Sequence, residues 1–155
     1  MIVDTSAIVA ILHGEPAAEA CLEALAGDSA PKMSAATAVE LYAVADSRGL
    51  PAQARRVDAL LLKLRIEIVP FDQAQAGLAR DAYRDFGKGS GSPARLNLGD
   101  CFAYALAAQT LEPLLFVGDD FTHTDLVPAL AGPGRSGDQR MALDDGVPAG
   151  ADPDH

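Results

Sequence analysis

The chain has 155 residues, a length that fits a single domain of ordinary size. Hydrophobic residues make up 49% of it and charged residues 22%, proportions that are usual in globular proteins and exclude a wholly disordered chain. Aromatic residues make up only 5%, so an aromatic platform for stacking nucleic-acid bases is not expected. Two distant cysteines, no export signal and no apolar run of membrane-spanning length predict a cytoplasmic protein with no membrane partner.

The formal net charge of -10 argues at first sight against a polyanionic partner such as RNA. The distribution of the charges along the chain weakens this argument against RNA. Three of the negative charges belong to the Gly/Pro-rich end of the chain, where five Asp stand against two Arg from Gly132 onward, and five belong to the acidic residues discussed below. We expect an organised domain over residues 1–130 and a disordered tail over residues 131–155. Overall acidity does not exclude RNA, because divalent cations would offset the clustered acids.

In the first half of the chain, short apolar runs alternate with segments of helical pattern. The first run stops at Asp4, and Thr5 or Ser6 can cap a helix directly behind it. Gly49 is a natural helix terminator, and Pro51 suits the first turn of the next helix. The expected elements are strand 1–3, helix 7–12, helix 16–26, strand 32–33, a helix from Ser34 or Thr37 to near Gly49, and helix 51–64.

The second half repeats the alternation. It predicts strand 66–69, a helix from the cap Asp72 to about residue 86, a glycine-rich loop 87–99, a mostly buried helix 100–108 and strand 114–117, which ends at Gly118. Strands that alternate with helices are typical of a three-layer α/β domain with a parallel sheet and right-handed crossovers.

Acidic residues fall where the predicted strands end. Asp4 follows the first strand, Asp119 and Asp120 follow the last, Asp100 opens the apolar helix before it, and Glu40 lies within another largely apolar helix. Each alone can be a helix cap, a solvated residue or an acidic turn. Because ligands bind outside the carboxyl ends of parallel strands, and like charges brought together need a cation, the set predicts a site for Mg²⁺ or Mn²⁺.

The chain resembles PIN-domain ribonucleases of the VapC toxin type in four segments with the same order and spacing: MIVDTSAIVAIL, SAATAVELYAV, GSPARLNLGDCFAYALA and PLLFVGDDFTHTDL. The resemblance covers about residues 1–128. It implies a PIN-like three-layer α/β/α sandwich with a mainly parallel sheet of four or five strands. It also implies a cytoplasmic, Mg²⁺-dependent endoribonuclease that forms a homodimer and is held inactive by a cognate VapB-type antitoxin, a segment of which covers the active site.

By position, the resemblance assigns the family's catalytic and metal-binding acids to this chain. The first acid matches Asp4, the second Glu40 and the third Asp100, while both Asp119 and Asp120 fit the fourth, with Asp119 preferred. Ser6, in the turn behind the first strand, matches the hydroxyl that supports the first acid. Mg²⁺ is the expected ion, with Mn²⁺ as a plausible substitute.

The expected chemistry is hydrolysis by a metal-activated water, which attacks phosphorus in line and leaves 5′-phosphate and 3′-hydroxyl ends. A metal-free ribonuclease would need two placed histidines, and the chain has only His13, His123 and His155. Phosphate contacts are expected from the basic residues that lead into the third acid, which are Arg80, Arg84, Lys88 and Arg95.

Two other functions remain open from the residues alone. A phosphatase of the haloacid-dehalogenase type also has an Asp after an early strand, but it needs a second Asp where this chain has Ser6. A non-catalytic module can use an acidic pocket to receive a basic peptide. ATP binding is disfavoured, because the loop sequence GKGSGS has no Ser or Thr after Lys88 and lacks the P-loop frame.

Overall fold

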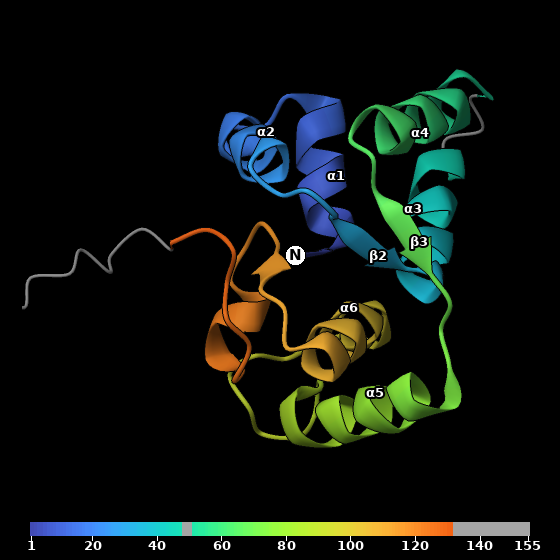
Figure 1. Cartoon of the computed structure of the whole chain (residues 1–155). Helices are drawn as coiled ribbons and strands as arrows, with labels where there is room; N and C mark the ends of the chain where they lie inside the picture. The colour runs from blue at the N-terminus through green and yellow to red at the C-terminus, as the bar shows by residue number, and fades with distance from the viewer. Residues whose placement is uncertain (48–50, 132–155) are drawn as a thin grey trace, which may run out of the picture.

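The computed structural model describes residues 1–47 and 51–131 and shows alternating strands and helices (Figure 1). The elements in chain order are β1 (Ile2–Val3), α1 (Thr5–His13), α2 (Ala18–Ala26), β2 (Lys32–Ser34), α3 (Ala35–Asp46), α4 (Pro51–Lys63), β3 (Glu67–Val69), α5 (Gln73–Phe86), α6 (Leu98–Thr110), β4 (Leu114–Leu115) and the short 3-10 helix η1 (Asp120–His123). The predicted helix end near Gly49 and the predicted tail lie outside the described residues, apart from Ala131.

The sheet is parallel, as predicted, and has the strand order β3-β2-β1-β4. The chain therefore builds outward from β1 to β3 and then returns to the other side of β1 through α5 and α6. The strands β1 and β4 flank the point where the strand order reverses, which is where parallel α/β sheets form a crevice at their carboxyl ends. An isolated parallel bridge between Leu114 and Pro128 extends the pairing beyond the fourth strand.

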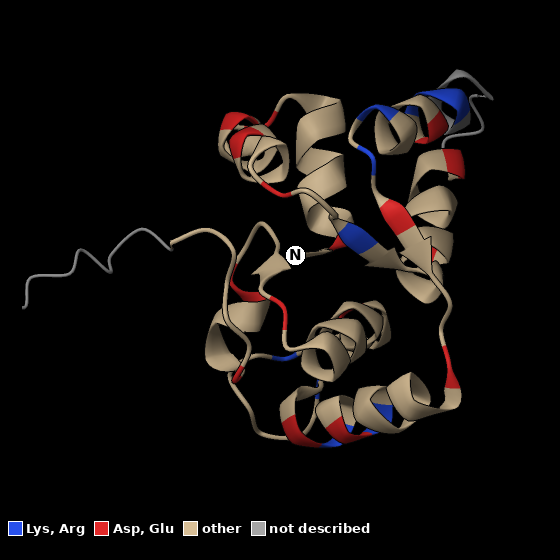
Figure 2. Ribbon diagram, in the orientation of Figure 1, with Lys and Arg blue, Asp and Glu red and all other residues tan. Residues whose placement is uncertain are grey.

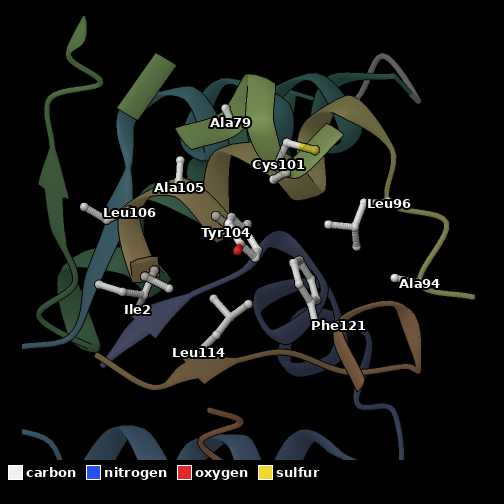
Figure 3. Packing of buried hydrophobic residues seen from close by; sticks show 13 residues of the cluster. Ile2, Ala79, Ala94, Leu96, Cys101, Tyr104, Ala105, Leu106, Leu114 and Phe121 are labelled. Atoms are coloured by element: carbon white, nitrogen blue, oxygen red, sulfur yellow. The ribbon is translucent and has the colours of Figure 1, made fainter. Parts of the chain in front are cut away.

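Helices cover both faces of the sheet and make the three-layer sandwich that the sequence predicts. Because side chains alternate along a strand, Ile2 packs toward α5 and α6, whereas its neighbour Val3 packs toward α1, α2, α3 and α4. Leu114 and Leu115 repeat this division on the adjacent strand. Figure 3 shows the first of these cores, in which Tyr104 and Leu106 of α6 lie together with Ile2 of β1 and Leu114 of β4.

The second helix begins at Ala18, two residues after the expected start, and two further helix starts differ because of their capping residues. Asp4, and neither Thr5 nor Ser6, caps α1, because its carboxylate accepts the backbone N–H of Ser6. Helix α6 begins at Leu98, two residues before the predicted start, because Asn97 is its cap and Asp100 stands at the third helical position. The two side chains form a reciprocal capping box, in which each accepts the other's backbone N–H.

The glycine-rich loop between α5 and α6 is closed at its base. Gly87 pairs with Leu96 in an isolated parallel bridge, and the N–H of Lys88 donates to the carbonyl of Leu96 at 3.0 Å. Lys88 and Arg95 therefore flank the neck of this loop, immediately before the cap Asn97. The bridge brings the backbone of Lys88 close to the segment that precedes α6.

None of the helices within the described residues is long and apolar enough to cross a membrane.

Replacing Gly87 with Ala should destabilise the fold. A Cβ at this buried position would overlap the backbone carbonyl oxygen of Tyr83, which cannot move without distorting the end of α5. We expect a loss of about 1–3 kcal/mol in the free energy of unfolding, measured by urea denaturation. The control is Gly77→Ala in the same helix, where a Cβ would meet nothing within 4 Å, and it should match or exceed wild-type stability. Equal stability of the two variants would contradict the close contact at Gly87.

Candidate active site

Asp4 is held at the end of β1 by the turn into α1. Its Oδ2 atom accepts hydrogen bonds from the backbone N–H of Ser6 at 3.0 Å and from the Ser6 hydroxyl at 2.6 Å. The same hydroxyl accepts the N–H of Val117, which follows β4, at 3.0 Å. Ser6 therefore connects the ends of the two strands that flank the crevice. Asp4 is only 4% exposed, and its other oxygen, Oδ1, is buried without a hydrogen-bond partner.

Glu40 reaches the same edge from the middle of α3. Its Oε2 atom accepts a hydrogen bond of 2.9 Å from the hydroxyl of Thr5, the first residue of α1. On its other side the carboxylate lies against Gly99 in the first turn of α6. The side chain thus joins three helices, α1, α3 and α6, at one point.

Asp100 is positioned by the capping box at the start of α6. Its Oδ2 atom accepts the N–H of Asn97 at 2.7 Å, and the Asn97 side chain accepts the N–H of Asp100 at 2.9 Å. Asp100 is 8% exposed, so this carboxylate is buried as well.

The three carboxylates share one arrangement. In each, protein donors hold one oxygen, and the other oxygen accepts no hydrogen bond from the residues that the structure describes. The free oxygen of Asp4 is also buried, and an unpaired buried oxygen costs about 1–3 kcal/mol, more when the group is charged. At one edge of the sheet, three carboxylate oxygens thus have no protein donor among the described residues. Such oxygens are suited to binding a cation.

The acids also act on one another electrostatically. Burial raises the pKa of Asp4, and the charge of Asp120 adds to that effect against the lowering by Ser6. Burial and the charge of Asp4 likewise raise the pKa of Glu40. The pKa of Asp100 is raised to about 6, mainly by burial and further by the charges of Asp4, Asp120 and Glu40. Residues from four separate parts of the chain therefore form one electrostatic cluster.

The fourth member of this cluster is Asp120. It is the first residue of η1, and its charge raises the pKa values of Asp4 and Asp100. Asp119 precedes η1, and its carbonyl accepts hydrogen bonds from Thr122. The charge interactions favour Asp120 as the fourth acid, and the sequence-based preference for Asp119 stays a prediction.

The acidic side chains of this site do not converge on a single point. Within residues 1–47 and 51–131, no three His, Cys, Asp or Glu side chains stand close enough together to hold a metal ion as they are placed. The donor set nevertheless fits a hard divalent cation, since it consists of carboxylate oxygens, one of them buried and orphaned on Asp4. A bound cation would lower the pKa values that burial and mutual repulsion raise.

The basic residues that are predicted to bind phosphate have different surroundings. Arg84 forms ion pairs with Asp81 at 2.9 Å and with Asp85 at 2.7 Å, so its charge is balanced locally. Arg80, Lys88 and Arg95 are exposed, and within the described part of the chain they form no ion pair. Figure 2 shows both signs of charge along α5, where the balanced pairs lie.

Sequence reasoning missed three residues that support the acids: Thr5, which binds Glu40, Asn97, which binds Asp100, and Gly99, which makes room for Glu40. For Asn97, a sequence pattern was available. The spacing of Asn97 and Asp100, three residues apart before an apolar run, is that of a capping box. The roles of the other two depend on contacts between helices and leave no local pattern.

The comparisons with known proteins agree with this architecture. The sequence model of the PIN domain family matches residues 1–126. The chain therefore belongs to the PIN domain family.

Curated relatives show which members of the PIN domain family the chain is similar to. Ribonuclease VapC42 of Mycobacterium tuberculosis is 56% identical over 129 residues, which are 83% of this chain and 98% of VapC42. Ribonuclease VapC28 of the same species is 49% identical over 130 residues, which are 84% of this chain and 98% of VapC28. This chain is thus similar to VapC ribonucleases over nearly their whole length.

Solved structures show the same fold at low sequence identity. VapBC2 from Rickettsia felis, solved with a DNA fragment from its promoter, matches with a TM-score of 0.65 at 17% identity, covering 82% of this chain and 95% of that one. VapC20 of Mycobacterium tuberculosis, described as a toxin that cleaves the sarcin-ricin loop, matches with a TM-score of 0.63 at 16% identity, covering 81% and 95%.

Replacing Asp100 with Asn should stabilise the metal-free protein at neutral pH. Its pKa of about 6 in the folded state lies above the ordinary value of 3.8, so the folded protein binds more protons than the unfolded chain between these pH values. Stability therefore falls as pH rises through this window, and the wild type carries the full cost above it. We expect Asp100→Asn to gain up to about 3 kcal/mol at pH 7 and little below about pH 4.

Urea unfolding in a chelating buffer at both pH values measures this difference. Asn keeps a side-chain oxygen that can accept the N–H of Asn97, so the capping box remains possible. Asp119→Asn is the control, because this aspartate is exposed and its side chain makes no capping hydrogen bond. A destabilised Asp100→Asn variant at pH 7 would show that the capping interaction outweighs charge repulsion.

Proposed function

We propose that the protein is an Mg²⁺-dependent endoribonuclease that hydrolyses RNA phosphodiester bonds and acts in the cytoplasm as the toxin of a VapBC-type pair. The observation that carries the proposal is the cluster of carboxylates whose open oxygens lie at the sheet edge between β1 and β4. Two findings support it further: the chain belongs to the PIN domain family, and relatives of up to 56% identity are named VapC ribonucleases.

Four residues would hold the cation: Asp4, Glu40, Asp100 and Asp120, with Asp119 beside them as the less favoured fourth acid. Mn²⁺ is a plausible substitute, because the ligands are all oxygens. When bound, the ion polarises a phosphate oxygen and lowers the pKa of a coordinated water. The open oxygens of Asp4 and Asp100 are the atoms best placed to bind, since protein donors already hold their partners.

Hydrogen-bonding neighbours orient these acids, and burial keeps two of them away from solvent. Ser6 fixes the rotation of Asp4 and ties the ends of β1 and β4 together through Val117. Thr5 does the same for Glu40. Burial of Asp4 and Asp100 limits solvent screening, so their charges act strongly on whatever binds at the crevice.

No protein base is required for this reaction. His13 is exposed at the end of α1 and His123 is exposed in η1, and neither donates a hydrogen bond to the acids within the described residues. We therefore propose water, and not the 2′-hydroxyl of RNA, as the nucleophile. The products then carry 5′-phosphate and 3′-hydroxyl ends.

Lys88 and Arg95 are proposed to bind substrate phosphates beside the scissile bond. They flank the closed neck of the loop that leads into α6, and Asp100 lies within the first turn of that helix. Arg80 and Arg84 belong to the same predicted set, but the ion pairs of Arg84 leave it less charge to offer RNA.

We also propose that a VapB-type antitoxin binds the protein and covers the acidic site. A toxin-antitoxin complex from Klebsiella pneumoniae has a similar fold, with a TM-score of 0.61 at 20% identity, and this likeness supports the proposal. A homodimer is proposed by analogy with the family. The apolar run on α4 gives it limited support, because Leu61 is buried in the core and only Leu62, at 81% exposure, is open on the surface.

Family membership weighs against the phosphatase alternative, and so does Ser6, whose hydroxyl donates to Asp4 where that chemistry needs an acid. The basic-peptide module differs from the nuclease only in having no catalysis. Cleavage of RNA separates the two.

Carboxylate variants should identify the four acids. Asp4→Asn and Asp120→Asn should each reduce Mg²⁺-dependent RNA cleavage by more than about 100-fold, because loss of a ligand exceeds the usual cost of losing a residue that merely supports one. Asp119→Asn should stay within a few-fold of wild type. Sequencing of the cleaved ends should find 5′-phosphates, whereas 2′,3′-cyclic phosphates would overturn the proposed nucleophile. Full activity of Asp4→Asn would refute the metal site.

The salt dependence of cleavage should report the phosphate contacts. Lys88→Ala and Arg95→Ala should each lower the slope of log kcat/KM against log salt concentration by about 0.7, the value per phosphate contact on a single strand. Arg84→Ala is the matched control and should leave the slope unchanged, since Asp81 and Asp85 balance its charge. Equal changes in all three variants would point to a general surface effect.

A further inference from the structure

Gly99 is the second residue of α6 and directly precedes Asp100. A Cβ placed on its backbone would lie 2.5 Å from Cδ of Glu40 and 2.8 Å from Oε2, and it would also overlap Oε1. No real Cβ approaches other atoms so closely. The space that a side chain would fill at position 99 is therefore the space that the Glu40 carboxylate occupies.

The backbone gives no other reason for glycine at this position. Four described glycines have positive φ values, Gly14, Gly89, Gly91 and Gly118, and Gly99 is not among them. Its conformation is that of an ordinary helical residue, which alanine adopts more readily than glycine. The space that the Glu40 carboxylate occupies is therefore the reason that the structure gives for glycine at position 99.

The atoms that meet Gly99 determine what a side chain there would do. At Gly87 the nearest atom is a backbone oxygen, whereas at Gly99 all three nearest atoms belong to the far end of a flexible side chain. An added methyl group at position 99 would therefore displace the Glu40 carboxylate and leave the helices where they are. The displaced carboxylate would lose its hydrogen bond from Thr5 or its place beside Asp100, whose pKa its charge now raises.

We propose that Gly99 is a positioning residue for the acidic site: its missing side chain seats the Glu40 carboxylate against the first turn of α6, beside Asp100. This inference rests on the proposed function, because it gives Glu40 a role in the reaction. It assigns to Gly99 no contact with substrate.

Gly99→Ala tests the inference through stability and function together. The melting temperature of the metal-free protein should stay the same or rise, because alanine favours the helix and the fold is not strained. The rise in melting temperature on adding Mg²⁺ should shrink, and RNA cleavage should fall roughly 10- to 100-fold, the usual cost of disturbing a residue that supports a metal ligand. Gly77→Ala, an alanine for a helical glycine in open space, is the matched control and should change neither.

A second substitution asks whether the effect passes through Glu40. In the Gly99→Ala background, Glu40→Asp shortens the acid by one methylene and makes room for the new methyl group. We expect this double variant to regain part of the Mg²⁺ response and at least about threefold in cleavage over Gly99→Ala. In the wild-type background the same Glu40→Asp change should reduce both.

The outcomes separate this inference from the proposed function. If Asp4→Asn is inactive and Gly99→Ala retains the wild-type Mg²⁺ shift and activity, the inference is wrong and the function stands. A large fall in the melting temperature of metal-free Gly99→Ala also overturns it, because glycine would then serve the fold. If the wild type shows no response to Mg²⁺, or Asp4→Asn cleaves RNA normally, the proposed function and the inference fail together.

Discussion

The burial of carboxylates close to one another is the constraint on which this molecule depends. Asp4 follows β1 directly, η1 carries Asp120 after β4, and the helices α3 and α6 bring Glu40 and Asp100 to the same site. Burial and the neighbouring charges raise the pKa values of Asp4, Glu40 and Asp100, so the charged form of each acid is disfavoured at this site. The rest of the fold, from the two apolar cores to the helix caps, supplies the stability that allows the cluster to exist.

The molecule limits this cost by using the acids as structural groups too. Asp4 caps α1 and Asp100 completes the capping box of α6, so each lies at a helix N-terminus, where backbone N–H groups and the helix dipole favour negative charge. One oxygen of each carboxylate serves the fold and the other is left for a ligand. Because each carboxylate uses one oxygen to cap a helix, the chain can keep its fold with Asp4 and Asp100 buried at one site.

Most of the fold could be predicted from the sequence, because short apolar runs ending at Asp, Pro or Gly mark the strands clearly. Helix ends were harder, since Asp4 and Asn97 compete with neighbouring residues that are equally good caps. The meeting of Asp4, Glu40 and Asp100 was predictable from strand ends and family resemblance. The choice between Asp119 and Asp120 was not, because it depends on the turn at Gly118, where φ is 107°, and on η1.

The strand β1 consists of Ile2 and Val3 alone, and Asp4 follows without a spacer. One inserted or deleted residue in this segment would turn the side chain that now faces α5 and α6 toward the opposite layer, and would point the acid away from the crevice at the same time. Exposed loop segments such as residues 88–91 have no comparable coupling between length and register. Changes in chain length during evolution are therefore expected to accumulate in the loops and to be absent from the first four residues.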